Sequence, residues 1–202
     1  MSRSNRRPVP KKKHRAVKIV LILFLLLCCA GIFLYTQHRE ILKQFYPLRY
    51  EEQISEYAGE EDLDPYLVMA VIRTESSFDP QAVSSAGACG LMQMTPQTLD
   101  WVCMLEGVSG YEEEDLFDPS TSIRFGCALL RYLIDKYQNV ETALAAYNAG
   151  VGNVDSWLQD STLSDGKGNL TNIPIAETRE YVKKVMQNRE IYQYLYSNFQ
   201  AK

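Results

Sequence analysis

A run of 17 residues without a charged side chain, Ile19–Tyr35, constrains the architecture of this chain more than any other feature. With Ala16, Val17 and Thr36 it reaches the ~20 residues that an α-helix needs to cross a bilayer. A buried core helix is disfavoured, because the basic residues just before the run would have nothing to pair with. The run therefore predicts a transmembrane helix at residues 19–36.

The charges of the chain are divided sharply around this run. Residues 1–18 carry eight Lys or Arg and no acidic residue, whereas the rest carries 13 Lys or Arg against 25 Asp or Glu, a net charge of −12. By the positive-inside rule, we expect the basic tail at residues 1–18 in the cytoplasm and the acidic body on the outer side of the membrane. A cleaved signal peptide or a lipoprotein fits less well, because the run is long and Cys28 follows Leu27 rather than a small residue.

The composition of the body excludes several kinds of site. Nucleic-acid binding needs Lys and Arg that neutralise phosphates, and the acidic body lacks the charge for it. Both histidines, His14 and His38, precede the body, and no Cys-x-x-Cys or Cys/His spacing indicates a metal site, so we expect no metal and no cofactor. For Cys89, Cys103 and Cys127, a Cys103–Cys127 disulfide and three buried thiols both remain open.

The body begins after a short stalk at residues 37–47, which is expected to continue the apolar helix, and it covers residues 48–202. Three times, a residue suited to the N-cap of a helix precedes a proline suited to its first position: Asp64-Pro65, Thr95-Pro96 and Asp118-Pro119. Such pairs mark helix starts rather than strand starts.

Hydrophobic periodicity in the body is also helical. Apolar residues recur at helical spacing over residues 66–74, 122–137 and 175–199. A helix around residues 143–147 is expected to end at Gly150 and Gly152. The polar stretch at residues 159–172 predicts a loop or at most a small hairpin. Because strand-like alternation is almost absent, we predict an all-α single domain.

Four short motifs occur in the body. The pair Glu75-Ser76 is followed by Gly-Leu-Met-Gln at residues 90–93 with Pro-x-Thr at residues 96–98, by Ala-Tyr-Asn-Ala-Gly-x-Gly at residues 146–152, and by Glu-Thr-Arg-x-Tyr-Val at residues 177–182. In order and spacing they resemble the soluble-lytic-transglycosylase (SLT) domain, glycoside hydrolase family 23, over residues 54–192. The resemblance implies a lysozyme-like fold, as in goose-type lysozyme. It also implies an enzyme whose partners are the glycan strands of peptidoglycan, and the predicted transmembrane helix would place this enzyme in the bacterial cell membrane.

Glu75 lies at the C-terminal end of an apolar helix. The helix dipole places partial negative charge there, which disfavours a carboxylate and should raise its pKa. Apolar neighbours should act in the same direction by desolvation. A carboxyl that stays protonated near neutral pH is what a general acid for glycosidic cleavage requires. Without the motif Glu75 would be read as a solvated surface residue, whereas the resemblance implies that it is the catalytic acid.

A second catalytic carboxylate is hard to find, since Asp79 lies in an Asp-Pro turn and Asp100 is expected to be solvated. The resemblance implies that Glu75 acts alone. It would protonate the oxygen between N-acetylmuramic acid and N-acetylglucosamine, then take a proton from the C6 hydroxyl that attacks C1, leaving a 1,6-anhydromuramic end. The alternatives are a hydrolytic muramidase, similar to goose-type lysozyme, and a non-catalytic cell-wall-binding or scaffold protein of a secretion or conjugation apparatus.

The resemblance also implies which residues bind substrate. They are Ser84, Gly90, Leu91, Met92, Gln93, Tyr147, Asn148, Glu177 and Tyr181. From the residues alone, Asn148 reads equally well as a helix cap, and Glu177 and Tyr181 as an ordinary pair on one helical face. By resemblance, the Tyr181 hydroxyl reaches the catalytic carboxyl, and Glu177 belongs to the floor of the site, paired with Arg179 or another base.

Overall fold

The structure, a computed structural model, describes residues 12–199, with side chains from Arg15 onward. The chain divides after Phe45 into two compact units. The first contains α1 (Lys12–Phe45), one continuous helix of 34 residues. Its apolar side chains are exposed along its length, with Leu27 at 72%. Among the described residues, α1 is the one helix long and apolar enough to cross a membrane.

Helix α1 covers the predicted anchor at residues 19–36 and continues through most of the predicted stalk. An uninterrupted apolar surface of this size is unusual on a protein that faces water on all sides. Residues 1–11 of the predicted basic tail lie outside the described residues, so the structure does not bear on them.

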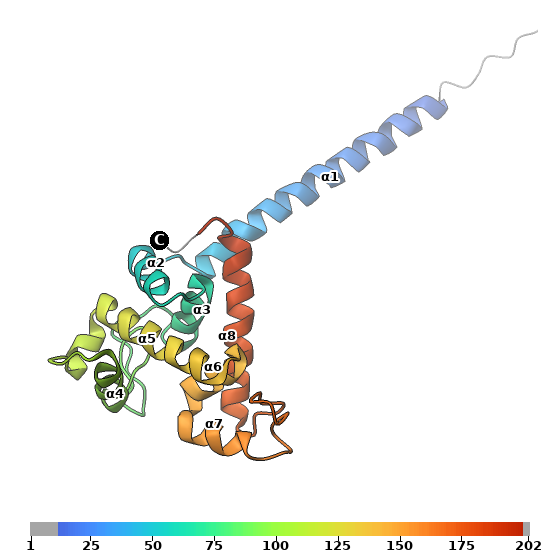
Figure 1. The fold of residues 1–202 in the computed structure, drawn as a ribbon. Helices are drawn as coiled ribbons and strands as arrows, with labels where there is room; N and C mark the ends of the chain where they lie inside the picture. The colour runs from blue at the N-terminus through green and yellow to red at the C-terminus, as the bar shows by residue number, and fades with distance from the viewer. Residues whose placement is uncertain (1–11, 200–202) are drawn as a thin grey trace, which may run out of the picture. The chain divides into compact units, whose positions relative to one another are not determined.

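In the second unit, which begins at Tyr46, the described elements are all helices. Its elements are α2 (Glu51–Glu60), α3 (Pro65–Glu75), α4 (Pro96–Glu106), the short 3₁₀ helix η1 (Glu113–Phe117), α5 (Pro119–Tyr137), α6 (Val140–Ala149), α7 (Val151–Leu158) and α8 (Ala176–Leu195) (Figure 1). In the part of the chain that the structure describes, extended backbone pairs only through isolated bridges. The prediction of an all-α domain is confirmed.

The three expected helix starts are also confirmed. The side chains of Asp64, Thr95 and Asp118 each accept a hydrogen bond from a backbone N–H in the first turn that follows, at 2.9, 3.2 and 2.9 Å. Each cap satisfies one N–H that the helix itself leaves without a partner. Proline follows at the first position, where its missing N–H costs nothing.

Other boundaries differ from those predicted. Gly150 ends α6, but Gly152 lies inside α7, a separate short helix that the pattern of apolar residues did not indicate. Helix α8 ends at Leu195 rather than at Phe199. The polar stretch at residues 159–172 is a loop with a single antiparallel bridge between Ser164 and Leu170, which agrees with the prediction.

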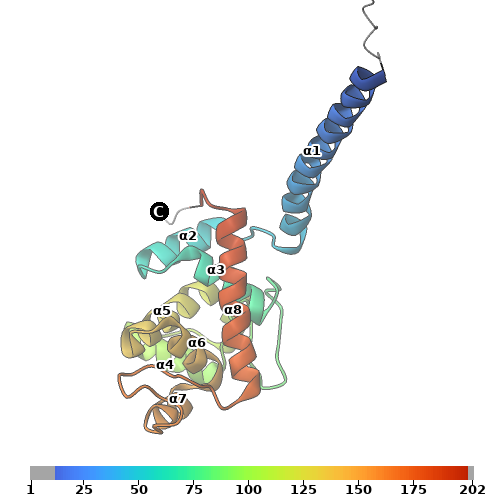
Figure 2. The ribbon, with the colours of Figure 1, turned by 90° about the vertical axis from the view of Figure 1, so that its right-hand side faces the viewer.

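The core of the second unit is built around α3. Its residues Leu67–Ile72 are all at most 2% exposed, so this helix is surrounded on every side. Helix α8 lies alongside it, as Figures 1 and 2 show. Two polar contacts fix the pair: the Asn188 amide donates to the Thr74 hydroxyl at 2.9 Å, and the Arg189 guanidinium contacts the Asp64 carboxylate at 2.5 Å. The last residue of α3, Glu75, is thereby held at a rigid position.

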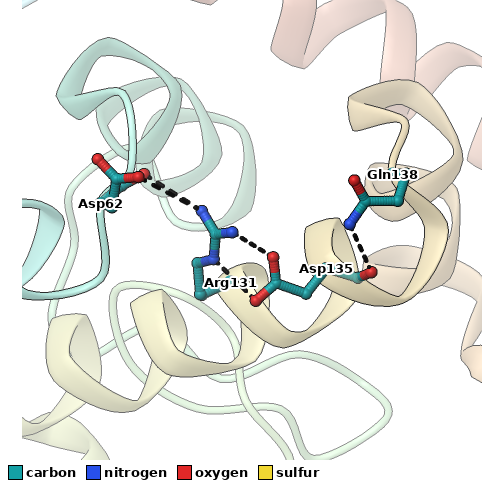
Figure 3. Close-up of polar contacts among 4 residues, drawn as sticks. All are labelled: Asp62, Arg131, Asp135 and Gln138. Carbon is teal, nitrogen blue, oxygen red and sulfur yellow. Dashed lines mark hydrogen bonds and ion pairs between the residues drawn. The ribbon is translucent and has the colours of Figure 1, made fainter.

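A polar contact on the surface joins α5 to the turn between α2 and α3 (Figure 3). Arg131 of α5 pairs with Asp135 one turn later and donates to the carbonyl oxygen of Asp62 at 3.4 Å. The Gln138 amide closes the end of α5 by donating to the Asp135 carbonyl oxygen at 2.8 Å. Such exposed ion pairs contribute about 0–1 kcal/mol each, so the buried core, and not this cluster, holds the helices together.

Candidate active site

Glu75 ends α3 at a sharp turn of the backbone. Ser77 and Phe78 both have positive φ, 54° and 65°, and the turn buries the Phe78 ring completely. The Ser76 hydroxyl donates to the Leu91 carbonyl oxygen at 2.8 Å. This bond ties the end of α3 to the loop that carries the Gly-Leu-Met-Gln motif, so two of the four motifs are in direct contact.

The carboxyl group of Glu75 is surrounded by protein on most sides. Burial raises its pKa from 4.5 to about 7, while the Tyr181 hydroxyl and the Lys184 ammonium group lower it to a smaller extent. The buried Tyr181 hydroxyl has no hydrogen-bond partner of ordinary length among the described residues, but it lies close enough to Glu75 to affect its pKa. Burial, and next the negative charge of Glu75, raise the pKa values of Tyr147 and Tyr181. A carboxyl in this state can donate a proton at neutral pH.

The loop after α3 is held in shape by its own side chains. The Gln93 amide donates to the carbonyl oxygens of Ala82 and Gly90, at 3.0 and 2.9 Å, and Gln93 itself has a φ of 48°. The Ser84 hydroxyl accepts from the Ala88 N–H at 3.0 Å. Gly90 is required, because a Cβ atom there would lie 2.0 Å from the Leu116 carbonyl oxygen. These contacts therefore fix the conformation of the loop after α3.

The end of α6 also contacts this loop. The Tyr147 hydroxyl donates to the Met92 carbonyl oxygen at 2.8 Å. After Asn148 the chain turns at Gly150, whose φ of 87° and ψ of 148° are accessible almost only to glycine. This turn brings the third motif beside the second.

One cleft of about 510 Å³ collects residues from all four motifs. Six of the ten predicted site residues line it: Glu75, Ser84, Gln93, Tyr147, Asn148 and Glu177. They come from α3, the loop after it, α6 and the first turn of α8. The cleft thus combines one carboxyl of raised pKa with several hydrogen-bonding side chains.

With this geometry in view, comparison with known proteins is decisive. Residues 52–168 match the family described as "Transglycosylase SLT domain". The chain belongs to that family. Residues 172–201 also match the family described as "Soluble lytic transglycosylase helical domain".

Among relatives of this SLT domain, the soluble lytic murein transglycosylase of Escherichia coli K12 is 35% identical over 156 residues, which are 76% of this chain and 24% of that protein. The crystal structure of the 70-kDa soluble lytic transglycosylase from Escherichia coli superposes with a TM-score of 0.71 at 34% identity, covering 78% of this chain and 26% of that one. The expected lysozyme-like fold of that family is thereby confirmed. The chain spans about a quarter of the length of these relatives.

A further relative has a name that refers to the membrane. The membrane-bound lytic murein transglycosylase C of Histophilus somni is 39% identical over 116 residues, 52% of this chain and 32% of that protein. Together with the long apolar helix α1, this weakly suggests that the SLT domain described here is attached to a membrane.

Four predicted site residues do not line the cleft of the SLT domain. Leu91 and Met92 are fully buried, and their side chains belong to the core. Gly90 packs against η1, and Tyr181 is buried close enough to Glu75 to affect its pKa.

Thr98 of α4 and Leu129 of α5 also line the cleft, although neither was among the predicted site residues. Ser76 does not line it, but fixes the end of α3. Thr98 and Ser76 both stand in the motifs, as the last residue of Pro-x-Thr and beside Glu75, and this was the available signal. The position of Leu129 depends on helix packing, which the local sequence does not reveal.

Glu177 is a second carboxylate on this cleft. It is exposed, lies in the first turn of α8, and forms no ion pair among the described residues. The expected pairing with Arg179 is absent, since that guanidinium donates to the Ile173 carbonyl oxygen at 2.6 Å. Asp79 accepts from the Gln81 N–H, which is the expected turn, and Asp100 is exposed as expected.

Within the described residues, no group of three or more His, Cys, Asp or Glu side chains is placed to hold a metal ion. Cys89, Cys103 and Cys127 are buried free thiols, so the disulfide considered above does not form. Burial raises the pKa of the Cys127 thiol most strongly.

Proposed function

We propose that this chain is a membrane-anchored lytic transglycosylase, which cleaves the β-1,4 bond between N-acetylmuramic acid and N-acetylglucosamine in peptidoglycan without water. The observation that carries the proposal is the position of the Glu75 carboxyl on the wall of an open cleft, where burial raises its pKa to about 7 and so favours a protonated carboxyl near neutral pH. The names of the relatives, lytic murein transglycosylases, agree with this chemistry.

In the first step, Glu75 gives its proton to the oxygen of the glycosidic bond as the bond from that oxygen to C1 of muramic acid breaks. The leaving N-acetylglucosamine takes this proton as a hydroxyl group. Positive charge develops at C1, and the neighbouring N-acetyl group of the same sugar can stabilise it. Glu75 is then a carboxylate, and the Tyr181 hydroxyl and the Lys184 ammonium group favour this state.

In the second step, the Glu75 carboxylate takes the proton of the C6 hydroxyl of the muramic sugar, whose oxygen forms a new bond to C1. The product carries a 1,6-anhydro ring, and Glu75 is protonated again for the next cycle. One carboxyl thus serves as acid and then as base. Ser84, Gln93 and Asn148 line the cleft where they can bind hydroxyl and N-acetyl groups of the strand.

For localisation, we infer a single-pass arrangement of α1 in the bacterial cell membrane, with the N-terminus in the cytoplasm and the second unit on the cell-wall side. The excess of Lys and Arg in residues 1–18 supports this orientation. Labelling of single cysteines placed before and after α1 by a membrane-impermeant reagent in intact cells tests it. Labelling on the N-terminal side alone would contradict it.

A hydrolytic muramidase remains the second candidate, because Glu177 places another carboxylate on the cleft, where it can orient a water molecule. Digestion of purified peptidoglycan by the full chain in detergent micelles, followed by mass spectrometry, separates the two. We expect 1,6-anhydromuramic ends. Reducing ends, heavier by one water, would favour the muramidase, and the absence of soluble products would favour a non-catalytic wall-binding or scaffold protein.

A further inference from the structure

A second, apolar cavity continues the cleft that contains Glu75. Thr98, Leu129, Tyr147 and Gly150 line both cavities, so the two share a wall made by α4, α5 and the end of α6. The second cavity has a volume of about 310 Å³, at the lower end of the ~300–1,000 Å³ that ligand pockets in proteins usually have. It extends the cleft by the space of one small ring.

Trp101 is the largest side chain in this second cavity. It follows Thr98 by three residues on α4, so the two lie on one face of the helix, while Leu99 and Val102 are buried in the core. The half-buried indole packs edge-to-face on Tyr132, with ring centroids 5.0 Å apart and an interplanar angle of 85°. Because this contact fixes the ring, a ligand that packs on it loses little conformational entropy.

The lining of the second cavity carries no charged group, in contrast to the first, which includes Glu75 and Glu177. Leu133 and Val151 complete an aliphatic and aromatic surface around Trp101. A carboxylate of a peptide stem or a phosphate would find no countercharge here, which makes its burial costly. The C–H face of a neutral pyranose ring fits such a surface, and its hydroxyl groups can remain in water at the rim.

We propose that this cavity, the Trp101 pocket, binds one N-acetylated sugar of the glycan strand, with the apolar face of its ring against the indole. The sugar would be a neighbour of the pair whose bond Glu75 cleaves, since the pocket adjoins the catalytic cleft. The proposal rests on the proposed function, because the strand that occupies the cleft supplies the sugar. Trp101 then determines how long a strand must be to bind well.

Fluorescence provides a direct test, because the chain contains two tryptophans, Trp101 and Trp157. In the full chain with Glu75→Gln and Trp157→Phe, Trp101 alone emits. The protein is kept in a detergent without a sugar head group, which would compete for the pocket. Titration with N-acetylglucosamine oligomers of two to six units should change the Trp101 emission in a saturable way, and affinity should rise with length until both cavities are filled.

Kinetics on peptidoglycan strands supplies the second readout. We expect Trp101→Ala to raise KM about tenfold, which corresponds to roughly 1.4 kcal/mol, with kcat changed much less, and Trp101→Phe to have an intermediate effect. Trp157→Phe is the matched control and should keep the KM of the wild type. Should Trp101→Ala disturb the packing on Tyr132, Val151→Asp places a charge in the pocket without touching that pair. Val151 is the first residue of α7, where the helix tolerates an acidic side chain, so the same rise in KM is expected.

The outcomes separate this proposal from the proposed function. Oligomer binding detected by calorimetry without any change in Trp101 emission, or an unchanged KM in both Trp101→Ala and Val151→Asp, would overturn the Trp101 pocket and leave the transglycosylase assignment intact. A saturable emission change in a chain that releases nothing from peptidoglycan would support the pocket and refute the enzymatic assignment. If no oligomer binds and nothing is cleaved, both fail.

Discussion

Two glutamates face the same cleft from opposite kinds of helix end. Glu75 is the last residue of α3, and burial raises its pKa to about 7. The helix dipole at that end also opposes a negative charge. Glu177 lies in the first turn of α8, exposed to solvent, where the dipole favours a negative charge. Identical side chains therefore stand in opposite electrostatic surroundings.

We infer from this difference that the depth at which a carboxyl lies, and the end of the helix it occupies, suit Glu75 rather than Glu177 to the role of acid in the proposed reaction. Proximity to the substrate alone does not distinguish the two glutamates, since both line the cleft. Changes at the end of α3 should therefore affect proton transfer, and changes at the start of α8 should mainly affect binding. The predictions below test that contrast, beginning with the largest expected effect.

The largest difference in activity is expected between Glu75→Gln and Glu177→Gln. Both substitutions retain the size of the side chain and remove the carboxyl. We expect Glu75→Gln to slow the release of soluble fragments from purified peptidoglycan by ~10²–10⁴-fold, the usual contribution of a general acid. Glu177→Gln should slow it by less than about tenfold, as for loss of a polar contact. Equal, severe losses in both variants would make the two carboxyls a hydrolytic pair and favour the muramidase.

The pH dependence of cleavage should follow the protonation of Glu75. Because the reaction begins with a protonated carboxyl of pKa about 7, the rate should fall about tenfold per pH unit above that value, and be ~100-fold lower at pH 9 than at its maximum. Initial rates on peptidoglycan between pH 5 and 9 measure this. Glu177→Gln should retain the alkaline limb at the same pH. A rate that stays constant up to pH 9 would contradict the role of Glu75 as acid.

The raised pKa also predicts that Glu75 destabilises the fold at high pH. Below pH 4.5 the group is protonated in both the folded and the unfolded chain. Between pH 4.5 and 7 the unfolded chain releases the proton first, so the folded state loses stability as pH rises. Glu75→Gln should therefore stabilise the second unit by about 1–3 kcal/mol at pH 8 and have no such effect near pH 4. Urea unfolding of the full chain, followed by tryptophan emission, measures the difference, and Glu177→Gln is the control.

Part of the fold and of the candidate site could be predicted from the sequence. The caps at Asp64, Thr95 and Asp118 follow from local hydrogen bonding, so their residue types were sufficient to place three helix starts. The position of Glu75 at the end of α3 followed from an apolar period that stops there. The motif did not distinguish Gln93, on the cleft, from its buried neighbour Met92, because membership of a motif does not reveal which way a side chain points.

What the sequence left undetermined depends on contacts between distant segments. The left-handed turn at Ser77 and Phe78 contains no glycine, and tertiary packing of the Phe78 ring stabilises it. The pocket around Trp101 requires α4, α5, α6 and the start of α7 to be assembled, and Trp101 itself belongs to none of the motifs. Glu177 was expected beside Arg179, but the Ile173 carbonyl oxygen accepts from that guanidinium instead.

The smallest expected effect is the change in the pKa of Glu75 when Lys184 of α8 is substituted. Lys184 of α8 lowers the pKa of Glu75 through its positive charge, but its side chain is exposed, so water and salt screen the interaction. Lys184→Gln should raise the pKa of Glu75 and move the alkaline limb of the pH profile upward by a few tenths of a unit at low ionic strength, and by less in about 1 M salt, where the screening length is ~3 Å.

Lys183→Gln is the matched control for this shift. Lys183 is an exposed neighbour that pairs with Glu180 at 3.8 Å and does not contribute to the pKa of Glu75. Its substitution should leave the alkaline limb where it is. Equal upward shifts in both variants would mean that overall charge, rather than the position of one ammonium group, sets the pH profile, and a downward shift in Lys184→Gln would contradict the effect of its ammonium group on Glu75. The contrast between the two helix ends would then be weaker than the geometry indicates.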